Sequence, residues 1–362
     1  MSNSVLIICT SLNMGGSERQ AVWLANKLIE ENKKVYFVSL KKAGILSDEL
    51  NPKIIINNFK LRNARNPITK IIYFFLGVIK LVNLVKKNQI KTVITFLFHS
   101  NVVGKLLKII CRNKILHIAS FRSDRLSKRD SKVSKFRTFI FKHFVIDKDI
   151  IVVFNSMSGS KNMKLGNINS KIIFNTPLNK IQQNNNRKSS EHKLVFIGRF
   201  DKLKNVENIV LSMKYLRDIN ISLDIFGKGS ESKTIELAIK EHELDEIVKL
   251  KGVDKDISNK LNNYDALIIA STHDAFPNVL IEAMNAGIVP ISTRVGDCSW
   301  LLNDNRGIFI DDFDPNSISI AIKKFCNIDS NQKNIILSNG KNFISRNLSE
   351  EKILKDWLSL LV

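Results

Sequence analysis

Cysteine is scarce in this sequence, and its few cysteines lie far apart. The 362 residues include four of them, which are Cys9, Cys111, Cys298 and Cys326. None of the intervals has the short spacing of a zinc site, and no pairing pattern indicates a disulfide framework. We therefore expect reduced thiols with a structural role, as in proteins of the cytosol.

A long uninterrupted apolar run is also missing. The longest, IIYFFLGVIKLVNLV from Ile71, is about one helical turn too short to span a bilayer, and Lys80 and Asn83 interrupt it. Residues 1–16 show neither a charged leader nor a small-residue cleavage site, so we expect no secretory signal. With 44% apolar and 25% charged residues, the composition is that of a globular protein, and the length suggests about two domains.

Acidic residues are almost absent from one region. Residues 51–143 hold 21 Lys and Arg but only two Asp and Glu. Residues 1–180 carry a net charge of +23, whereas residues 181–362 carry −1. This asymmetry indicates an anionic partner for the first half, either nucleic acid or a membrane with anionic lipid. Aromatic rings among the basic residues, as in SKFRTFIFKHF, suit an interface that accepts rings as well as charge. Lysine on an ordinary solvated surface is the plain alternative.

Short β-branched runs alternate with amphipathic helical segments along most of the chain. VLIICTSL, KTVITFLF, KLVFIGRF and ALIIAST are typical of strands, and SERQAVWLANKLIEEN is typical of a helix. Continuous apolar strands that alternate with helices predict βαβ units and parallel sheets. The predicted fold class is therefore α/β, with two doubly wound, Rossmann-like parallel-sheet domains.

One polar, Asn-rich stretch, NKIQQNNNRKSSEHK, breaks this alternation and is interpreted as an interdomain linker. The predicted domains are residues 1–180 and 193–344, joined by a linker at 181–192 and followed by a helix at 345–362. Ligands of open α/β sheets bind beyond the carboxyl ends of the strands. We therefore expect the two domains to face each other across a cleft that holds the site.

Paired glycines follow the first predicted strand. Gly15 and Gly16 precede a helix for which Ser17 is the expected N-cap, in a capping-box pattern with Gln20. Glycines allow close approach of a ligand to the backbone, and free amides at a helix start attract phosphate. The spacing is not G-x-G-x-x-G, so an ordinary strand–helix turn is the alternative.

Two further loops follow strands in the second half. In FIGRFDKLKN, Arg199 and Lys204 are cations five positions apart, which suits binding of a diphosphate. In DIFGKGSE, Gly227 and Gly229 form another glycine loop before a helix. Surface charge in the first case and a plain turn in the second are the alternatives.

The stretch STHDAFPNVLIEAMNAG combines carboxylates with a helix start. Proline suits the first turn of a helix and glycine its end, so we predict a helix over Pro277–Ala286 that is closed by Gly287. Such a helix directs the amides of Asn278 and Val279 toward the cleft. The chain reaches this point from the predicted strand ALIIAST, at the ligand-binding edge.

Glu282 lies on a polar stripe of this helix with Asn278 and Asn285. Its carboxylate could accept hydrogen bonds from a sugar diol, or the stripe could simply face water. Asp274 precedes the helix at the mouth of the expected cleft. His99 directly follows the strand KTVITFLF and is the histidine best placed for a role in the cleft.

Taken together, these segments resemble family 4 of the retaining glycosyltransferases, in glycosyl transferases group 1, which has the GT-B fold. The matching motifs are GGSER, FNS at 154–156, IIFNTPLN at 172–179, GRFDKLKN, DIFGKGSE, KGV at 251–253 and HDAFPNVLIEAMNAG. They follow the family's order and cover nearly the whole chain. The last is the most specific, because an acidic residue is followed after seven intervening positions by a glutamate.

The resemblance implies that the second domain binds a nucleotide-activated sugar, often linked to UDP. Arg199 and Lys204 match the pair that neutralises the diphosphate, and Glu282 matches the glutamate that holds the ribose. Asp274 stands near the donor sugar, where the family has the longer glutamate. This departure indicates a different donor, a shifted backbone or weak activity. The other implied donor contacts in this domain are Gly227, Val253, Phe276, Pro277, Asn278 and Val279.

In the first domain, the resemblance assigns Gly15 and Gly16 to a loop that closes over the phosphates, and His99 to a place near the transferred sugar. It implies no metal, because Arg199, Lys204 and helix amides balance the charge. It also implies no cofactor, since the nucleotide-sugar is a substrate. The final helix is expected to pack back across both domains.

The implied reaction is glycosyl transfer with retention at the anomeric carbon, in which the leaving phosphate accepts the proton of the acceptor and no protein nucleophile acts. The first domain then binds a saccharide or a polyprenyl-diphosphate-linked acceptor. Its basic segments at 59–87 and 121–144 imply a peripheral contact with the inner face of the cytoplasmic membrane. We expect a bacterial enzyme of surface polysaccharide or lipopolysaccharide biosynthesis.

Two alternatives have a different chemistry. A non-hydrolysing UDP-sugar epimerase can share the two-domain fold, but it needs further acid–base carboxylates, and the first half offers no convincing set. A nucleic-acid-binding protein would explain the charge of the first half. However, the sequence lacks zinc spacing, an RNP-type aromatic motif and a basic zipper, so no nucleic-acid partner is expected.

Overall fold

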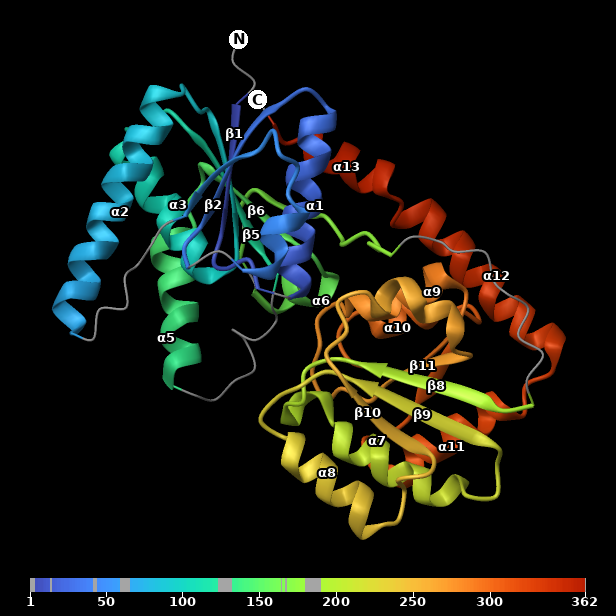
Figure 1. The fold of residues 1–362 in the computed structure, drawn as a ribbon. Coiled ribbons are helices and arrows are strands. Elements are labelled where there is room, and N and C mark those ends of the chain that lie inside the picture. Colours follow the sequence, from blue (N-terminus) through green and yellow to red (C-terminus); the bar gives the residue numbers. More distant parts are fainter. Residues whose placement is uncertain are drawn as a thin grey trace. The chain divides into compact units, whose positions relative to one another are not determined.

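The chain forms two compact units, one of Met1–Asn175 with Ile353–Val362 and one of Thr176–Lys352 (Figure 1). The computed structural model describes residues 4–13, 15–41, 44–58, 66–122, 132–163, 165–166, 168–179 and 190–361, with the backbone alone for 67–71 and 132–135. Most of the predicted linker at 181–192 lies outside these ranges. None of the described helices is long and apolar enough to cross a membrane.

Within the described residues, the first unit holds a seven-stranded parallel sheet in the order β3-β2-β1-β4-β5-β6-β7. The central strands are buried on both faces, as expected of continuous apolar runs between helical layers. The strands are β1 (Ser4–Cys9), β2 (Lys34–Ser39), β3 (Ile55–Asn58), β4 (Thr92–Phe96), β5 (Leu116–Phe121), β6 (Ile150–Phe154) and β7 (Ser170–Ile172).

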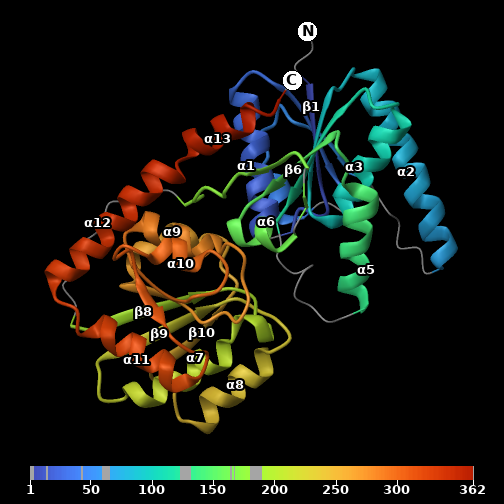
Figure 2. The same cartoon turned by 180° about the vertical axis from the view of Figure 1, so that it is seen from behind.

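Helices cover both faces of this sheet (Figures 1 and 2). The helical segments are α1 (Gly16–Glu30), η1 (Ile45–Glu49), α2 (Pro67–Lys87), α3 (Phe98–Ile110), α5 (Lys132–Ile140), the π-helical turn η2 (Phe141–Val145) and α6 (Met157–Met163). One face of α2 is apolar at helical spacing and packs with α3 and the sheet through Val78, Leu81, Val82 and Val85.

The last part of the chain completes the core of the first unit. Trp357 of α13 (Glu350–Leu358) is buried, with its ring centroid 5.9 Å from that of Phe96. The guanidinium of Arg122 lies 5.1 Å from the Phe96 ring and 5.5 Å from the Trp357 ring. Its Nε donates a hydrogen bond to Ser120 Oγ at 2.7 Å, and burial lowers the pKa of Arg122 to about 9. The helix predicted at 345–362 is therefore split between the end of α12 and α13.

The second unit holds a six-stranded parallel sheet in the order β10-β9-β8-β11-β12-β13, built from the fully described stretch 190–352. The strands are β8 (His192–Ile197), β9 (Ile221–Phe226), β10 (Val248–Gly252), β11 (Ala266–Ile269), β12 (Val289–Thr293) and β13 (Ile308–Ile310). The helical segments are η3 (Lys202–Lys204), α7 (Val206–Ser212), η4 (Met213–Leu216), α8 (Ser232–Glu241), η5 (Ile257–Asn263), α9 (Asn278–Ala286), α10 (Cys298–Leu302), α11 (Pro315–Cys326) and α12 (Ser330–Asn347).

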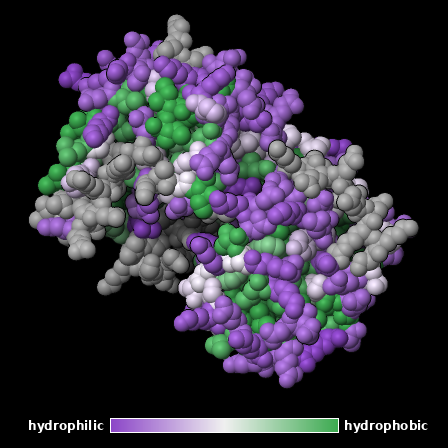
Figure 3. All heavy atoms as spheres, in the orientation of Figure 1, coloured by the Kyte–Doolittle hydropathy of each residue, from purple (hydrophilic) through white to green (hydrophobic). Residues whose placement is uncertain are grey.

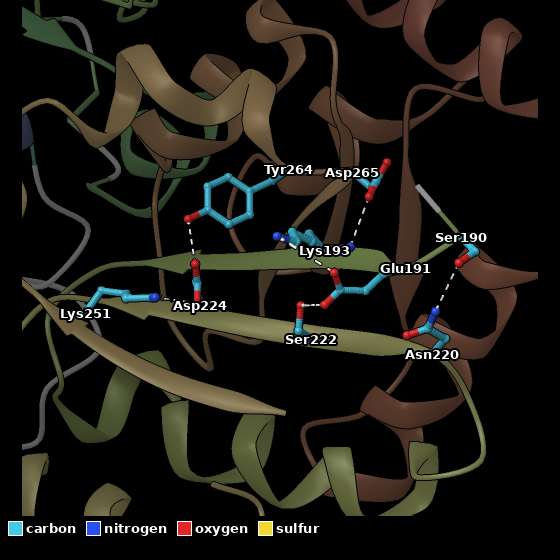
Figure 4. Close-up of polar contacts among 9 residues, drawn as sticks. All are labelled: Ser190, Glu191, Lys193, Asn220, Ser222, Asp224, Lys251, Tyr264 and Asp265. Carbon is cyan, nitrogen blue, oxygen red and sulfur yellow. Dashed lines mark hydrogen bonds and ion pairs between the residues drawn. The ribbon is translucent and has the colours of Figure 1, made fainter. Parts of the chain in front are cut away.

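Polar contacts anchor the segment between β10 and β11 to the second sheet (Figure 4). Tyr264 Oη donates a hydrogen bond to Asp224 Oδ2 of β9 at 2.9 Å, and Lys251 Nζ lies 3.5 Å from Asp224 Oδ1. The backbone N–H of Lys193 donates to Asp265 Oδ2 at 3.0 Å. Burial and the carboxylate of Asp224 raise the pKa of the Tyr264 hydroxyl, which therefore stays a donor. These contacts fix the end of η5, the segment that carries Ser258.

Candidate active site

The predicted donor residues follow the two central strands of the second sheet. Arg199 and Lys204 follow β8, and Asp274 and Glu282 follow β11. β8 and β11 are neighbours at the point where the strand order reverses. Open α/β sheets bind ligands at this switch point, beyond the carboxyl ends of the strands. The topology therefore brings the predicted cations and the predicted carboxylates to the same edge of the sheet.

Backbone hydrogen bonds join the loops at this edge. Thr272 N–H donates to the Leu203 carbonyl at 2.9 Å, which links the loops after β8 and β11. Glu231 N–H donates to the Phe200 carbonyl at 3.0 Å, which adds the loop after β9. Since these amides bond to neighbouring loops, the edge is a preformed framework for the side chains that it carries.

Lys204 and Asp274 form an ion pair. Both side chains are largely buried, although their residues lie 70 positions apart in the sequence. The short Asp274 carboxylate thus reaches the Lys204 ammonium across the β8 and β11 loops. The pair holds a cation in place at the switch point, where an anionic ligand would meet it.

Arg199 is differently placed. Its side chain is 61% exposed and forms an ion pair with Asp201 at 3.2 Å. An exposed guanidinium can turn toward a ligand without disturbing the core, and its planar fork suits two phosphate oxygens. The two predicted cations therefore differ, because Lys204 is held by a carboxylate within the loops and Arg199 faces solvent.

Glu282 is almost completely buried, with 1% of its surface exposed. Its Oε2 accepts a hydrogen bond from Ser258 Oγ at 2.7 Å, and its backbone carbonyl accepts one from Asn179 Nδ2 at 2.9 Å. The interpretation that the polar stripe of α9 faces water is wrong for this residue. A buried carboxylate must be paired or hydrogen-bonded, and Ser258 provides one such partner.

Ser258 and Asn179 are site residues that the sequence did not reveal. Asn285 Nδ2 donates to Asn179 Oδ1 at 3.0 Å, so the polar stripe of α9 meets the segment before the second sheet. Ser258 lies 24 positions before Glu282 on η5, and Asn179 lies 103 positions before it. No local spacing connects such pairs, and only the final asparagine of IIFNTPLN hinted at a role.

The helix α9 begins one residue later than predicted. Pro277 is its N-cap, with φ −73° and ψ 114°, and the first helical residue is Asn278. Gly287 closes the helix in the left-handed conformation, with φ 73°, as predicted. The amides of Asn278 and Val279 thus lie in the first turn of α9, at the carboxyl edge of β11. Their predicted contacts to a sugar or phosphate stay predictions, as do those of Phe276.

Gly227 has a structural reason to be glycine. Its φ is 147°, and an added Cβ would overlap the carbonyl of Gly198 in the β8 loop. The residue is therefore needed where two loops approach each other, and a contact with the donor stays a prediction. Val253, another of the implied donor contacts, follows β10 with an exposed side chain.

In the first unit, the start of α1 differs from the prediction. Gly15 is the N-cap in an extended conformation and no side chain caps the helix, so the predicted cap at Ser17 is wrong. The carboxylate of Glu18 lies against Gly15 and accepts a hydrogen bond from Ser11 Oγ at 3.2 Å. This helix terminus already carries a negative charge, which the expected phosphate contact of Gly15 and Gly16 would have to displace.

His99 lies in the first turn of α3, directly after β4. Burial and the positive charges of Arg137 and Lys41 lower the pKa of His99, so the ring is neutral at neutral pH. Leu97, the N-cap of α3 two residues before His99, has φ 75° and ψ 161°, a region that residues other than glycine rarely adopt. Strained backbone of this kind is concentrated at functional sites, and its position here supports a role for His99.

A cavity of about 390 Å³ lies elsewhere in the second unit. Arg294, Phe309 and Lys324 are among its lining residues, and none of the predicted donor residues lines it. The guanidinium carbon of Arg294 lies 3.6 Å from the centroid of the Phe309 ring, so two of the lining side chains stack on each other. Among the described residues, no group of three His, Cys, Asp or Glu side chains is arranged to hold a metal ion.

Several curated proteins that resemble the chain are named as glycosyltransferases. The chain is 27% identical to N-acetyl-alpha-D-glucosaminyl L-malate synthase of Bacillus anthracis over 41% of this chain and 37% of that protein. It is 26% identical to lipopolysaccharide core biosynthesis glycosyltransferase LpsD of Rhizobium meliloti, over 46% and 48%. It is 24% identical to capsular polysaccharide biosynthesis glycosyltransferase CapH of Staphylococcus aureus, over 82% of each chain. The first two alignments thus span less than half of the relative's length.

Solved structures match nearly the whole chain. A glycosyltransferase from Rickettsia africae has a TM-score of 0.81 at 16% identity, covering 99% of this chain and 97% of the other. Anabaena Alr3699/HepE in complex with UDP and glucose has a TM-score of 0.82 at 16% identity, covering 99% and 98%. At this identity the likeness concerns the fold alone, and the predicted GT-B fold class is confirmed.

The family model described as Glycosyl transferases group 1 matches residues 179–343. This stretch contains the Lys204–Asp274 pair, Glu282 and its partners Ser258 and Asn179, and it covers a little less than half of the chain. The solved structures thus show the GT-B fold, and residues 179–343 are similar to glycosyl transferases of group 1.

Proposed function

We propose that this protein is a retaining glycosyltransferase of family 4 that transfers a sugar from a UDP-sugar to a saccharide or lipid-linked acceptor. The observation that carries the proposal is the edge of the second sheet, where the Lys204–Asp274 pair, Arg199 and the buried Glu282 follow the two strands at the switch point. The match of residues 179–343 to Glycosyl transferases group 1 supports it.

Arg199 and Lys204 are proposed to bind the donor diphosphate. The charge that develops on the diphosphate as it leaves is the largest electrostatic demand of the reaction. Lys204 supplies a fixed charge, and Arg199 supplies a fork that can turn onto two oxygens. We propose that these cations balance the charge without a metal ion. The neighbour HepE was solved with UDP and glucose, which supports UDP as the nucleotide.

Glu282 is proposed to accept hydrogen bonds from the ribose hydroxyls of the nucleotide. The bond from Ser258 Oγ to Oε2 fixes the orientation of the carboxylate in the protein. A carboxylate that is already buried and oriented loses little freedom when a diol binds, and hydrogen bonds to charged groups are strong. This orientation gives Ser258 a positioning role.

Asp274 is proposed to act at the donor sugar and to position Lys204. In the structure its carboxylate pairs with the ammonium of Lys204. When the diphosphate binds, the ammonium can share its hydrogen bonds between the phosphate and Asp274, because it has three donors. The shorter side chain of Asp274 is then used to hold the cation.

The first unit is proposed to bind the acceptor, with His99 near the transferred sugar. A neutral imidazole can donate or accept a hydrogen bond to a sugar hydroxyl. In the proposed reaction, the acceptor hydroxyl attacks the anomeric carbon on the face that the diphosphate leaves, and a phosphate oxygen takes the proton. The names of the relatives LpsD and CapH support a role in bacterial lipopolysaccharide or capsular polysaccharide synthesis. The cytoplasmic face of the membrane is the proposed location.

The donor assignment is tested by binding. UDP and UDP-sugars should raise the unfolding temperature of the protein more than GDP- or ADP-sugars do. Lys204→Met should weaken UDP binding by about tenfold or more, as expected for charge-assisted hydrogen bonds. Lys202→Met in the same loop, where the side chain is exposed, is the matched control and should leave UDP binding unchanged. Equal effects of the two substitutions would contradict the site.

The reaction is tested with a UDP-sugar that supports binding. Proton NMR of the product should show the anomeric configuration of the donor, whereas inversion would contradict the retaining assignment. Incubation without an acceptor should give at most slow hydrolysis. A new sugar nucleotide in that incubation would identify an epimerase instead.

A further inference from the structure

The cavity in the second unit lies between helix α11 and the segment that contains the edge strand β13. β13 is the last strand in the order of the second sheet, and α11 packs on it. Four lining residues recur along one face of α11 at spacings of three, four and seven positions, and these are Ser317, Ile320, Ala321 and Lys324. The volume of about 390 Å³ is within the range of small-molecule sites, roughly 300–1,000 Å³.

Arg294 is held at the wall of this cavity by an aromatic ring. Its guanidinium carbon lies 3.6 Å from the centroid of the Phe309 ring, a contact that restrains the side chain without using its N–H groups. Among the described residues, Arg294 forms no ion pair and no side-chain hydrogen bond with the protein. Its N–H groups are therefore available in a planar fork, which suits two oxygens of a phosphate or carboxylate.

Positive charge exceeds negative charge in the cavity. Lys324 lines it beside Arg294, and no acidic residue of the described chain pairs with either cation. Of the two lining carboxylates, Asp304 pairs at 2.8 Å with Nη1 of Arg306, which is not a lining residue. Only Asp311 is left without a partner in the described part of the lining. Two cations and one carboxylate favour a ligand that carries an anionic group together with hydroxyl groups.

The rest of the lining suits a sugar ring. Leu302, Ile320 and Ala321 supply an apolar wall, and the side-chain amides of Asn303 and Asn305 supply donors and acceptors. A pyranose has the matching surface, because its C–H groups form apolar faces and its hydroxyl groups surround the edge. Figure 3 shows hydrophilic residues over much of one face of the second unit, with hydrophobic residues in smaller groups among them. A hollow that combines both kinds of residue can bind and orient a small polar ligand.

One loop separates the cavity from the proposed donor site. Arg294 begins the loop between β12 and α10. In the same loop, Gly296 lies so close to the carbonyl of Asp274 that an added Cβ would overlap it, and Asp297 N–H donates to the Ala275 carbonyl at 3.0 Å. The cavity thus adjoins the loop that carries Asp274 but shares no lining residue with the proposed donor site.

We infer that this cavity is a second ligand site, which binds a monosaccharide unit that carries a phosphate or a carboxylate. Arg294 forks onto two oxygens of the anionic group, and Lys324 adds a second positive charge. Asp311 accepts hydrogen bonds from hydroxyl groups, and the apolar wall contacts a face of the ring. The site does not depend on the proposed function, because none of the proposed donor residues contributes to it.

Calorimetric titration tests the site without any need for activity. Glucose 6-phosphate and glucuronic acid are the charged probes, and glucose and inorganic phosphate each supply one half of the proposed ligand. The galactose and mannose counterparts of both charged probes are titrated as well, to cover other arrangements of the hydroxyl groups. At least one charged sugar should bind about tenfold or more tightly than glucose and inorganic phosphate do. The preferred sugar shows whether the anionic group is a phosphate or a carboxylate.

Substitutions test the position of the site. Arg294→Met should weaken binding of the preferred sugar by about tenfold or more, and Arg294→Lys, which keeps the charge without the fork, should weaken it less. Lys324→Gln should weaken binding by about threefold, as expected for an exposed charge. Lys323→Gln changes the neighbouring residue of α11, outside the lining, and is the matched control that should bind like the wild type. Arg294 and Lys324 are exposed, so these variants should keep the unfolding temperature of the wild type.

Competition with UDP separates this site from the proposed donor site. Saturating UDP should not displace the preferred sugar, and Lys204→Met should bind that sugar like the wild type. If UDP displaces the sugar, or if Lys204→Met loses it, the sugar binds at the donor edge and the inference is wrong. It is also wrong if no charged sugar binds better than glucose and phosphate, or if Arg294→Met binds as well as the wild type. UDP binding is measured for Arg294→Met and should be unchanged, so that failure of the cavity site is distinguished from failure of the donor site.

Discussion

The sheets of the two units have the same strand order over their first six strands, but the units expose different side chains at the carboxyl ends of these strands. Both sheets place the first strand of the unit beside the fourth, β1 beside β4 and β8 beside β11. In the second unit, the loops after these strands are joined by hydrogen bonds and hold paired charges such as Lys204 and Asp274. In the first unit, the edge is bordered by exposed phenylalanines on basic helices. The same topology thus gives a preformed polar site in one unit and an apolar, basic surface in the other.

This difference is consistent with two kinds of ligand. A soluble nucleotide-sugar carries charge and hydroxyl groups in a fixed arrangement, which preorganised polar side chains can match. An acceptor held in a membrane arrives with a large apolar phase beside it, which apolar side chains can enter. Three substitutions and one pH titration test this difference between the units, in order of decreasing expected effect.

Trp357→Ala tests whether the end of the chain belongs to the first unit alone. The buried indole packs on Phe96 and Arg122, so its loss should lower the free energy of unfolding of that unit by about 3–5 kcal/mol in urea. UDP binding should persist, because the proposed donor-binding residues lie in the second unit. Lys355→Ala on the same helix is the control, with an expected change within about 0.5 kcal/mol. If Trp357→Ala were as stable as the wild type, α13 would not contribute to the core of the first unit.

Glu282→Gln tests whether donor binding rests on the second unit. A hydrogen bond to a charged group contributes about 1.5–3 kcal/mol, so the dissociation constant of UDP should rise by about 10- to 100-fold. Calorimetric titration measures it, and Glu236→Gln on α8 is the exposed control. Unchanged UDP affinity in Glu282→Gln would place the ribose elsewhere.

Acid should destabilise the first unit through His117. Burial lowers the pKa of His117 to about 3, whereas the unfolded chain titrates near 6.5. Between these values the unfolded state binds one more proton than the folded state, so stability is full above about pH 6.5 and falls by about 1.4 kcal/mol per pH unit below it. Urea unfolding at several pH values measures the slope. His117→Gln should flatten it, and an unchanged slope would assign the acid sensitivity to other groups.

Ser258→Ala should have the smallest effect. The hydroxyl donates to Glu282 Oε2, and its loss should weaken UDP binding by about fivefold, near 1 kcal/mol. Ser258→Thr keeps a hydroxyl and should recover most of the affinity, while Ser338→Ala on α12 serves as the exposed control. If threonine does not rescue the loss, the effect is one of packing at η5.

The sequence predicted those features that are encoded locally. Continuous β-branched runs predicted the buried parallel strands, and Gly287 predicted the end of α9, because each depends on residues next to one another. The candidate carboxylates and cations were found in the same way, at the ends of strands. The fold class was confirmed on these grounds, while the roles of the site residues stay predictions.

Contacts between residues far apart in the chain could not be predicted from the sequence. Ser258 and Asn179 reach Glu282 across 24 and 103 residues, and no periodicity connects them. The predicted cap at Ser17 was wrong because the backbone is extended at Gly15 and the Glu18 carboxylate lies against it. The strained Leu97 before His99 also left no mark in the sequence, because leucine gives no sign of a positive φ.

The return of residues 353–362 to the first unit has a consequence for synthesis on the ribosome. The core of that unit lacks Trp357 until residue 357 has been translated, whereas residues 176–352 form a continuous stretch that emerges earlier and can fold as soon as it does. Domains usually complete folding from the amino terminus during synthesis at about 5–20 residues per second. Here the order is reversed, and the amino-terminal unit, with its exposed phenylalanines, is the last to become complete.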